Sequence, residues 1–418
     1  TTFFEGVHLL GRSSNGIYDL NTNKINFKRY YELKYNKSSS FPKFADTLRE
    51  YSRHFMQSIN LRLRSDVKVG SCLSGGMDSS SVCAMSSKLL AKNNIKLTAI
   101  HAKSTEEKTD ESEYANVVGD HCNLYLHIIE PTVDNFINNI DEVAYTQEEP
   151  FVSTSIYMQY FVMQKAKELG CKVMLDGQGG DETLLGYERY YPAAYLDIYR
   201  KSGIFQALKA TYSSSKNNKK MNLIWIIKYF IASVFPQLRK MYLLYHSNFI
   251  KKEFRPTMSF FDDISFSYLR NVFLLQKLEI ENTNLPVLLR YEDKNSMRHS
   301  IEARLPFLDF NLVEFSLSSN TQHKIQDGWT KYLLRKFIEE NLPSKLVWRK
   351  SKLGFNAPEN TWIDSLSSVM EKEIFNSKLI QKVSNLKKLK KKYPKLRPLH
   401  KWRLYSLAVW ERVFNVEV

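Results

Sequence analysis

The residues best suited to chemistry lie in a segment rich in serine and glycine, residues 74–80, with the sequence Ser-Gly-Gly-Met-Asp-Ser-Ser. It follows an apolar run, residues 67–73, and precedes a helical repeat of Val82, Met85 and Leu89. Glycine allows a tight turn, and the free amide groups at a helix start attract anions such as phosphate. The segment lacks the Gly-Lys-Ser/Thr ending of a Walker loop, so transfer of a γ-phosphate is not implied. The pattern favours a phosphate-binding loop over a simple turn.

A second candidate segment, residues 176–182, reads Asp-Gly-Gln-Gly-Gly-Asp-Glu and follows another predicted strand, residues 172–175. Its three glycines bring the backbone close to a ligand, and the Asp181 carboxylate suits a Mg²⁺ ion that neutralises a leaving pyrophosphate. By itself, an acidic glycine-rich turn is more often a solvated loop. Its place after a strand, together with the first loop, favours a ligand site.

Two later segments carry charged residues in an ordered pattern. Residues 290–309 alternate charged and apolar side chains up to a Pro-Phe-Leu sequence that we expect to be buried. For Glu302 and Arg304, a buried ion-pair network is as good an interpretation as a functional one. Residues 327–335 contain Lys331, which at the start of a helix would ordinarily be a surface residue.

Strand patterns alternate with helical patterns through the first half of the chain. This order predicts an α/β fold, with a parallel sheet covered by helices on both faces. Ligands of such sheets bind at the carboxyl ends of the strands, so the loops after Leu73, Ala102 and Leu175 are expected to form the site. After about residue 183 the pattern is mainly helical to the end. The predicted strands are residues 67–73, 96–102, 123–129 and 172–175, and the longer helices between them are residues 111–122 and 155–169.

The first 36 residues have a different pattern and are too few for a core of their own. They are expected to form short strands, with turns at residues 13–16 and 21–23. A polar Lys-Ser-Ser-Ser linker, residues 37–40, then precedes a helical pattern that begins near residue 41. We therefore place a domain boundary between residues 36 and 37.

The charge distribution indicates a local basic segment rather than a basic domain. The 418 residues carry a formal net charge of +16, and residues 378–403 hold eleven lysines and arginines without any acid. We expect this segment to be a solvated helical face. The alternative is a non-catalytic nucleotide-binding or nucleic-acid-binding protein that uses the segment, with Tyr393 and Trp402, on phosphates. The 4 cysteines show no metal-ligand spacing and no secretory leader is recognised, so a cytoplasmic location is expected.

The most apolar run is residues 222–238, interrupted by Lys228 and Pro236. It is too short for a comfortable membrane span. A core helix is the favoured interpretation. The alternative is a helix at a membrane surface, flanked by lysines and arginines on both sides.

Taken together, the four segments, in this order and at these separations, resemble the synthetase half of the asparagine synthase (glutamine-hydrolysing) family. The resemblance covers residue 37 to the end and is highly specific. Residues 1–36, with Phe-Phe-Glu-Gly-Val and Arg-Tyr-Tyr, resemble the tail of the N-terminal glutaminase domain (Ntn-type) of that family. The resemblance implies the adenine nucleotide alpha hydrolase-like fold of PP-loop ATP pyrophosphatases, followed by a mainly helical part. It also implies that the catalytic cysteine of the glutaminase lies outside this chain, since Cys72 is the first cysteine.

The resemblance also implies roles for individual residues. ATP and Mg²⁺ are the expected cofactors, with the metal held by Asp78 and Asp181. Lys331 matches the catalytic lysine of the family, Asp293 an acidic position of the second site, and Gln178 a position that is glutamate in the best-known asparagine-forming members. For His101, a partly buried strand residue is a better interpretation than an acid or base. The residues expected to contact the nucleotide are Leu73, Ser74, Gly75, Gly76, Asp78, Ser79, Ser80, His101, Asp176 and Gly177.

The implied reaction is AMP-forming amide synthesis. A carboxylate, the β-carboxylate of aspartate in the leading hypothesis, is adenylated by ATP, and ammonia from glutamine then displaces AMP to give asparagine. A Gln178 amide can orient a substrate but accepts no proton usefully, so the asparagine-specific acid–base scheme transfers less well than the adenylation chemistry. An alternative is a relative acting on another substrate, such as a lasso-peptide or β-lactam synthetase or a sugar-acid amidotransferase. The glutaminase is expected in cis or in trans, and a homodimer is one assembly left open.

Overall fold

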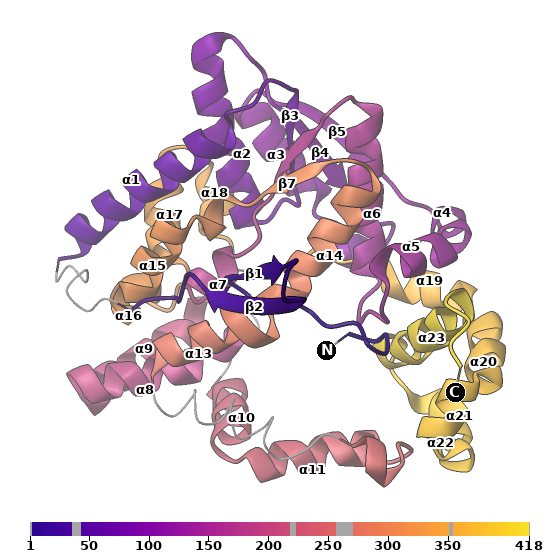
Figure 1. Ribbon diagram of the computed structural model, residues 1–418. Coiled ribbons are helices and arrows are strands. Elements are labelled where there is room, and N and C mark those ends of the chain that lie inside the picture. Colours follow the sequence, from indigo (N-terminus) through magenta and orange to yellow (C-terminus); the bar gives the residue numbers. More distant parts are fainter. Residues whose placement is uncertain (1, 36–42, 218–222, 256–270, 351–353, 418) are drawn as a thin grey trace.

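A five-stranded parallel sheet forms the centre of the computed structural model (Figure 1). The structure describes residues 2–35, 43–217, 223–255, 271–350 and 354–417. The predicted α/β fold is confirmed. In spatial order, the strands are β5 (Tyr125–Ile129), β4 (Thr98–Ala102), β3 (Val69–Cys72), β6 (Val173–Leu175) and β7 (Glu302–Arg304), each parallel to its neighbours.

Helices make up most of the remaining described structure. The earlier ones are α1 (Phe44–Arg62), α2 (Met77–Leu90), α3 (Ser112–His121), α4 (Val133–Asn138), α5 (Ile140–Gln147), α6 (Ser155–Glu168), α7 (Gly180–Thr183), α8 (Tyr191–Ser202), α9 (Ile204–Asn217), α10 (Leu223–Val234) and α11 (Pro236–His246). The later ones are α13 (Val272–Leu278), α14 (Leu285–Arg298), α15 (Phe310–Ser318), α16 (Thr321–Lys324), α17 (Tyr332–Ile338), α18 (Ser344–Val347), α19 (Glu359–Ser365), α20 (Ser367–Asn376), α21 (Lys378–Val383), α22 (Leu386–Lys392) and α23 (Pro398–Val413). Among the described residues, the structure holds no helix with both the length and the apolar character that a membrane span requires.

The strand order places the two glycine-rich loops side by side. From β3 the chain runs outwards through β4 to β5, and it returns on the other side of β3 with β6. The order therefore reverses between β3 and β6, which is where ligands bind in open α/β sheets. Because Ser71 of β3 lies opposite Leu175 of β6, the loops that follow the two strands begin at nearly the same level.

Successive side chains of the strands point alternately into two separate hydrophobic cores, one on each face of the sheet. Ile100, Ala102 and Met174 pack in the core that contains α6 and α23. Ala99 and Leu175 pack in the other core, which contains α1, α2 and α17. The strands therefore have both faces buried, as a parallel sheet requires, and helices fix the sheet from both sides.

The first residues form a hairpin that packs on the rest of the molecule. The strands β1 (Ser14–Asp19) and β2 (Lys24–Arg29) are antiparallel and enclose the turn predicted at residues 21–23. The turn predicted at 13–16 is wrong, because residues 14–16 already pair with β2. The Tyr31 hydroxyl donates to Glu314 Oε1 (2.9 Å). The predicted linker and domain boundary lie outside the described residues.

The sequence analysis did not predict the strand β7. β7 has three residues, too few for a period of two to be recognised, and its partner β6 lies more than a hundred residues earlier. Its Arg304 bonds to the carbonyls of Arg62 and Arg64 and pairs with Glu302 (2.8 Å). Since Glu302 is exposed, the two residues do not form the buried network that was one of the two interpretations.

The apolar run at residues 222–238 does not form a core helix, which corrects the favoured prediction. It contributes to α10 and α11, and in α10 only Ile226 is fully buried among the residues whose side chains are described. Trp225, Ile227 and Phe230 are exposed. The sequence shows that the run is apolar, but whether another element covers it depends on the tertiary arrangement.

The basic segment at residues 378–403 is solvated on its charged face, as predicted. Most of its lysines lie on α21 and α22, while the aromatic residues of the segment point inwards. Tyr393 and Trp402 are buried in the core that contains α23. They are not available to stack on nucleic acid, so the nucleic-acid alternative loses the aromatic contacts on which it depended.

Candidate active site

The first loop, residues 74–76, joins β3 to α2 and has a shape that depends on glycine. Gly75 has a φ of +80°, and a Cβ atom there would lie 2.8 Å from the carbonyl oxygen of Glu111. Within the loop, the Ser74 amide donates to Ser79 Oγ (3.1 Å), and Ser79 Oγ donates to the Gly76 carbonyl (3.2 Å). These bonds hold the start of α2, with its free amide groups, at the carboxyl end of β3.

The second loop, residues 176–179, lies directly against the first. A Cβ atom on Gly177 would be 2.6 Å from the Ser79 amide nitrogen, and one on Gly180 would be 2.7 Å from Asp78 Oδ1. No side chain fits at either place without displacing the first loop. The glycines of the second segment therefore allow the two loops to approach each other closely, in addition to leaving space for a ligand.

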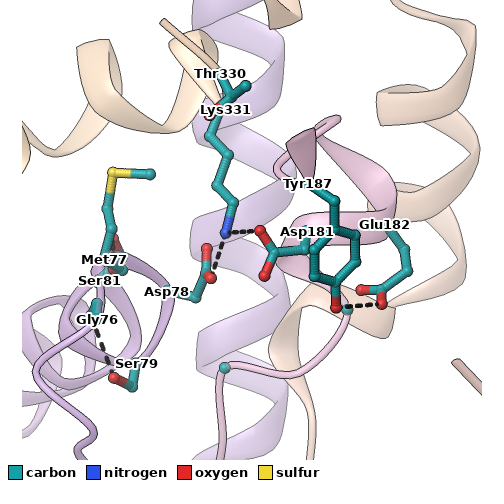
Figure 2. Close-up of polar contacts among 12 residues, drawn as sticks. Gly76, Met77, Asp78, Ser79, Ser81, Asp181, Glu182, Tyr187, Thr330 and Lys331 are labelled. Atoms are coloured by element: carbon teal, nitrogen blue, oxygen red, sulfur yellow. Dashed lines mark hydrogen bonds and ion pairs between the residues drawn. The ribbon is translucent and has the colours of Figure 1, made fainter. Parts of the chain in front are cut away.

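A buried lysine joins the two loops electrostatically. Figure 2 shows the Lys331 side chain reaching down between the carboxylates of Asp78 and Asp181. Its ammonium nitrogen lies 2.6 Å from Asp181 Oδ1 and donates to Asp78 Oδ2. The Lys331 side chain is only 4% exposed. Three residues from three distant parts of the sequence thus form one charged cluster.

The backbone at Lys331 adopts a conformation that is costly for a residue with a side chain. Its φ of 53° and ψ of 34° lie in the left-handed region, immediately before α17. Such a conformation persists only where the surroundings enforce it, and it is common at functional sites. Here the Lys331 amide donates to the Leu184 carbonyl (3.3 Å), which ties α17 to the second loop.

The two carboxylates keep Lys331 charged. Burial alone lowers the pKa of its ammonium group, but the attraction of Asp181 and Asp78 outweighs burial, so the pKa lies above the usual value for lysine. With both carboxylates beside it, Lys331 is therefore a cation at neutral pH. A fixed cation of this kind can stabilise negative charge on phosphate or on an oxyanion.

A second pair of acids joins the second loop to α14. Asp176 is the first residue of that loop, and Glu292 lies on α14. Burial raises the pKa of Asp176 and of Glu292. The neighbouring Asp176 raises the pKa of Glu292 further, whereas the hydrogen bond with Glu292 lowers that of Asp176. Glu292 Oε2 accepts from the Gln159 side-chain amide. Two carboxyl groups in contact cannot easily both ionise, so we conclude that they share a proton.

These elements surround a pocket of about 350 Å³. Apolar side chains of β4 and α6, among them Ile100, Ala102 and Ile156, line part of it. Charged residues of the loops line the rest, including Lys331 and Arg349. Apolar walls with a few convergent polar groups suit a ligand that has both a flat ring and phosphates.

The structure brings most of the predicted site residues to this pocket, but not all of them. Those that line it are Leu73, Ser74, Gly76, Asp78, Ser79, Asp176, Gly177, Gln178, Asp181 and Lys331. Gly75 and Ser80 support the loop from behind and do not line the pocket.

Two predicted residues point elsewhere. The His101 side chain faces away from the pocket, because its neighbours Ile100 and Ala102 line it and successive strand residues alternate. Its Nδ1 contacts the Leu73 carbonyl (2.8 Å), and burial lowers its pKa. Asp293 is exposed and does not line the pocket, so the structure does not support a catalytic position for it; the buried acid is its neighbour Glu292.

Two arginines at the pocket were not given a role from the sequence. Arg335 donates to the Thr330 carbonyl (2.9 Å), and burial lowers its pKa to about 10. Arg349 bonds to Glu111 (2.5 Å) and lines the same pocket. The spacing of four residues between Lys331 and Arg335 was a usable signal, because residues i and i+4 lie on one side of a helix.

The residues present fit a Mg²⁺ ion that is shared with a substrate. Asp78 and Asp181 face each other from opposite loops with the Lys331 ammonium group between them, and carboxylate oxygen is the ligand that Mg²⁺ prefers. Among the described residues there is no group of three or more His, Cys, Asp or Glu side chains that could form a complete metal cage. Mg²⁺ commonly takes its remaining ligands from phosphates and water, so two carboxylates are sufficient.

Comparisons of the sequence with known proteins identify several relatives. The chain is similar to asparagine synthetase [glutamine-hydrolyzing] 1 of Bacillus subtilis (strain 168), with 27% identity over 354 residues, covering 81% of this chain and 54% of the relative. It is also similar to amidase chry2 of Gibberella zeae, with 24% identity over 405 residues, covering 87% of this chain and 60% of the relative. A putative asparagine synthetase [glutamine-hydrolyzing] 2 of Methanocaldococcus jannaschii is 30% identical over 202 residues, covering 48% of this chain and 38% of the relative.

The chain thus spans between about two fifths and three fifths of the length of these relatives. The sequence model of one family, described as asparagine synthase, matches residues 50–412. This match includes the loops, Lys331 and both cores of the sheet. The chain belongs to the asparagine synthase family.

Proposed function

We propose that this chain is the synthetase part of an ATP-dependent ligase that releases AMP and pyrophosphate and forms an amide. The observation that carries the proposal is the buried cluster of Lys331, Asp78 and Asp181 between two glycine-rich loops. Family membership supports the same chemistry. Arg335 and Arg349 line the same pocket and would add positive charge for phosphates.

In the first proposed step, a carboxylate oxygen of the acceptor attacks the α-phosphorus of ATP. The bond from that phosphorus to the bridging oxygen breaks, pyrophosphate leaves, and an acyl-adenylate remains. The residues of the first loop would hold the pyrophosphate by their amide and hydroxyl groups. A Mg²⁺ ion held by Asp78 and Asp181 would neutralise negative charge on the leaving group.

In the second proposed step, the lone pair of ammonia attacks the acyl carbon, the bond from that carbon to the AMP oxygen breaks, AMP leaves, and the nitrogen releases a proton to water. Negative charge develops on the carbonyl oxygen and on the departing phosphate. Lys331 is charged and fixed in a buried site, so we assign it to the stabilisation of this charge rather than to proton abstraction. Gln178 lines the pocket and would orient the acceptor by hydrogen bonds.

Aspartate is the proposed acceptor, and its β-carboxylate the proposed site of adenylation. Ammonia would come from glutamine through a glutaminase domain in cis or in trans, of which residues 1–36 would be the end. A second candidate is amidation of a different acid. It is favoured by the aromatic side chains that line the pocket, Tyr187, Tyr191 and Trp329, because flat or ring-shaped acceptors stack on such residues.

The direct test is ATP/pyrophosphate exchange by the purified chain with a panel of carboxylic acids and Mg²⁺. Exchange measures adenylation alone and needs no glutaminase. Exchange that depends on aspartate supports the leading proposal. Exchange that depends only on a sugar acid or a peptide carboxylate supports the second candidate. No exchange with any acid, in a folded preparation that binds ATP, contradicts the proposed adenylation.

A further inference from the structure

An apolar surface outside the proposed active site is formed by α10 and α11. We define this α10–α11 surface by six exposed side chains: Trp225, Ile227, Phe230, Phe235, Met241 and Tyr242. Met241 is 66% exposed and Tyr242 is 61% exposed. Figure 1 shows α10 and α11 along one margin of the molecule, away from the central sheet.

α10 exposes more apolar side chains than a helix that only faces water, and α11 adds further exposed apolar side chains. Helices with apolar residues around most of their circumference are normally buried in a core or in lipid. Scattered exposed apolar residues are ordinary, but a contiguous group on adjacent helices marks an interaction site. α10 and α11 follow each other directly and contact each other, which brings exposed apolar residues of the two helices near one another.

The charge of the surrounding segment is of one sign. Residues 198–252 contain eleven lysines and arginines and no acid. Three of these basic residues, Lys228, Arg239 and Lys240, lie within α10 and α11 themselves. A surface that is both apolar and strongly basic is complementary to a partner that is apolar and anionic.

The structure adds a second basic segment to the same margin. The Lys251 amide donates to the Val383 carbonyl (3.0 Å), and Lys392 Nζ donates to the Tyr245 carbonyl (2.7 Å). These bonds place the lysine-rich α22 next to the end of α11, as Figure 1 also shows. Residues 198–252 and 378–403 together hold more positive charge than the formal net charge of +16 of the whole chain, so the rest of the molecule is net negative.

Three kinds of partner differ in how they suit this surface. A second copy of the chain would bring two basic surfaces together, which like-charge repulsion opposes. Nucleic acid stacks on aromatic side chains, but it gains little from Ile227 and Met241. A lipid bilayer takes up aliphatic side chains in its acyl region, tryptophan and tyrosine at the headgroup level, and lysines at anionic headgroups.

We propose that the α10–α11 surface, with α22 beside it, docks the protein on an anionic lipid bilayer. The helices lie on the bilayer surface and do not cross it. The apolar side chains enter the boundary between headgroups and acyl chains, while Lys228, Arg239 and Lys240 contact lipid phosphates. This proposal is independent of the reaction that the pocket catalyses.

The test is flotation of the 418-residue chain with two kinds of vesicle at low salt. One kind is pure phosphatidylcholine, and the other contains about one third phosphatidylglycerol. We expect binding to the anionic vesicles, at least about tenfold weaker binding to the neutral ones, and release by high salt. Equal binding to both kinds, or binding to neither, overturns the proposal.

Charge variants identify the surface. The triple variant Lys228→Glu, Arg239→Glu and Lys240→Glu should weaken binding to anionic vesicles at least about a hundredfold. The matched control, Lys24→Glu, Lys92→Glu and Lys108→Glu, makes the same change of net charge at exposed positions elsewhere and should weaken binding much less. Equal losses in both triples contradict a localised surface.

An apolar variant separates lipid from the other partners. Trp225→Ser, Ile227→Ser and Phe235→Ser should reduce vesicle binding at least about tenfold and leave the mass in solution by light scattering unchanged. A stable dimer that this variant dissolves, or tight binding of a polyuridine oligonucleotide in place of vesicles, overturns the proposal. Circular dichroism and thermal melting show whether each variant is folded. If the apolar triple variant does not fold, the charge triple variant alone tests the proposal.

Discussion

Lys331 is a buried cation, and contacts with the surrounding fold stabilise it in this unfavourable position. Its side chain is held by Asp78 and Asp181, and its backbone lies in the left-handed region before α17. A surface lysine at a helix start would have neither feature. The combination of burial, paired carboxylates and backbone strain is what distinguishes this residue from the ordinary interpretation of its sequence position.

Replacement of Lys331 tests its assigned role. Lys331→Met keeps most of the side-chain volume but removes the charge that would stabilise phosphate and oxyanion, so exchange with the accepted acid should fall by about 10²–10³-fold. Lys336→Met, further along α17, removes a lysine that pairs with Glu339 near the surface and serves as the control. A Lys331→Met enzyme with normal exchange and normal amide formation would falsify the assignment.

Asp78 is tested by a change that keeps its shape. Asp78→Asn should abolish exchange while the fold is retained, because the amide provides no charge for a metal ion or for Lys331. Any residual exchange should require more Mg²⁺ than in the unchanged chain. Asp46→Asn, in the first turn of α1, is the control. Unchanged exchange and unchanged Mg²⁺ dependence in Asp78→Asn would count against the metal role.

At the scale of elements, the close contact of the second loop with α17 depends on Gly186. Its amide donates to the Asp181 carbonyl (2.8 Å), and a Cβ atom on Gly186 would overlap both Asp181 Oδ1 and Lys331 Cε. Whatever the chemistry of the acceptor, the charged cluster can form only where no side chain occupies this position.

Gly186→Ala should therefore damage the site more than the fold. We expect exchange to fall at least about tenfold, with a loss of unfolding free energy of about 1–3 kcal/mol from overpacking. Exchange assays and urea denaturation measure the two effects separately. Gly11→Ala is the control, since the nearest atom to its added Cβ is Ser14 Oγ at 3.6 Å. Full activity in Gly186→Ala would show that the cluster tolerates displacement.

The end of α14 predicts a pH dependence of stability. His299 is buried against Tyr160 (ring centroids 4.6 Å apart), and burial, with help from Lys167 and Arg298, lowers its pKa to about 4. The unfolded chain binds a proton near pH 6.5, so it binds more protons than the folded chain between pH 6.5 and about 4. The contribution of His299 to the free energy of unfolding is complete above pH 6.5 and decreases as the pH falls from 6.5 to about 4.

Thermal melting at pH 7.5 and at pH 4.5 checks this dependence. The variant His299→Phe keeps an aromatic ring and has no titrating group, so its melting temperature should fall less between the two pH values than that of the unchanged chain. His8→Phe, at an exposed position, should leave the difference as it is. The same pH difference in His299→Phe as in the unchanged chain would refute the role of this histidine.

At the scale of the whole molecule, the C-terminal helices are part of the same core as the sheet. Trp402 of α23 contacts Phe136, Phe151 and Tyr157, with ring centroids 5.5–5.8 Å apart. This core also contains Ile100 and Ala102 of β4, which line the pocket from the sheet. The basic segment is therefore the outer side of a structural element and not an appended arm.

Truncation of this tryptophan should destabilise the entire chain. Trp402→Ala leaves a cavity in the core and should lower the unfolding free energy by about 3–5 kcal/mol, measured by urea denaturation. Phe205→Ala removes an aromatic side chain that is 85% exposed, and its effect should stay within about 0.5 kcal/mol. A small loss in Trp402→Ala would mean that α23 unfolds separately from the sheet.

Several features of the fold were predictable from the sequence because they depend on neighbouring residues. The runs that became β3, β4, β5 and β6 have strand-like patterns, and the helices between them have a helical repeat. The glycine-rich segments marked the loops, and parallel sheets bind ligands at the ends of their strands. Local sequence was therefore sufficient for the α/β class and for the edge of the sheet that holds the pocket.

Other features depended on contacts between distant residues. The burial of Glu292 and the exposure of Asp293 depend on the rotation of α14, since adjacent helix residues point in directions about 100° apart. The exposure of α10 and the pairing of β7 required knowledge of what packs beside them. Lys331 meets Asp78 across 253 positions of sequence. The sequence by itself determined which residues could carry charge, turn tightly or bury a ring, because these are properties of residues and their neighbours. Only the tertiary structure decided which of them meet, because burial, shared protons and enforced backbone strain arise from packing over the whole chain.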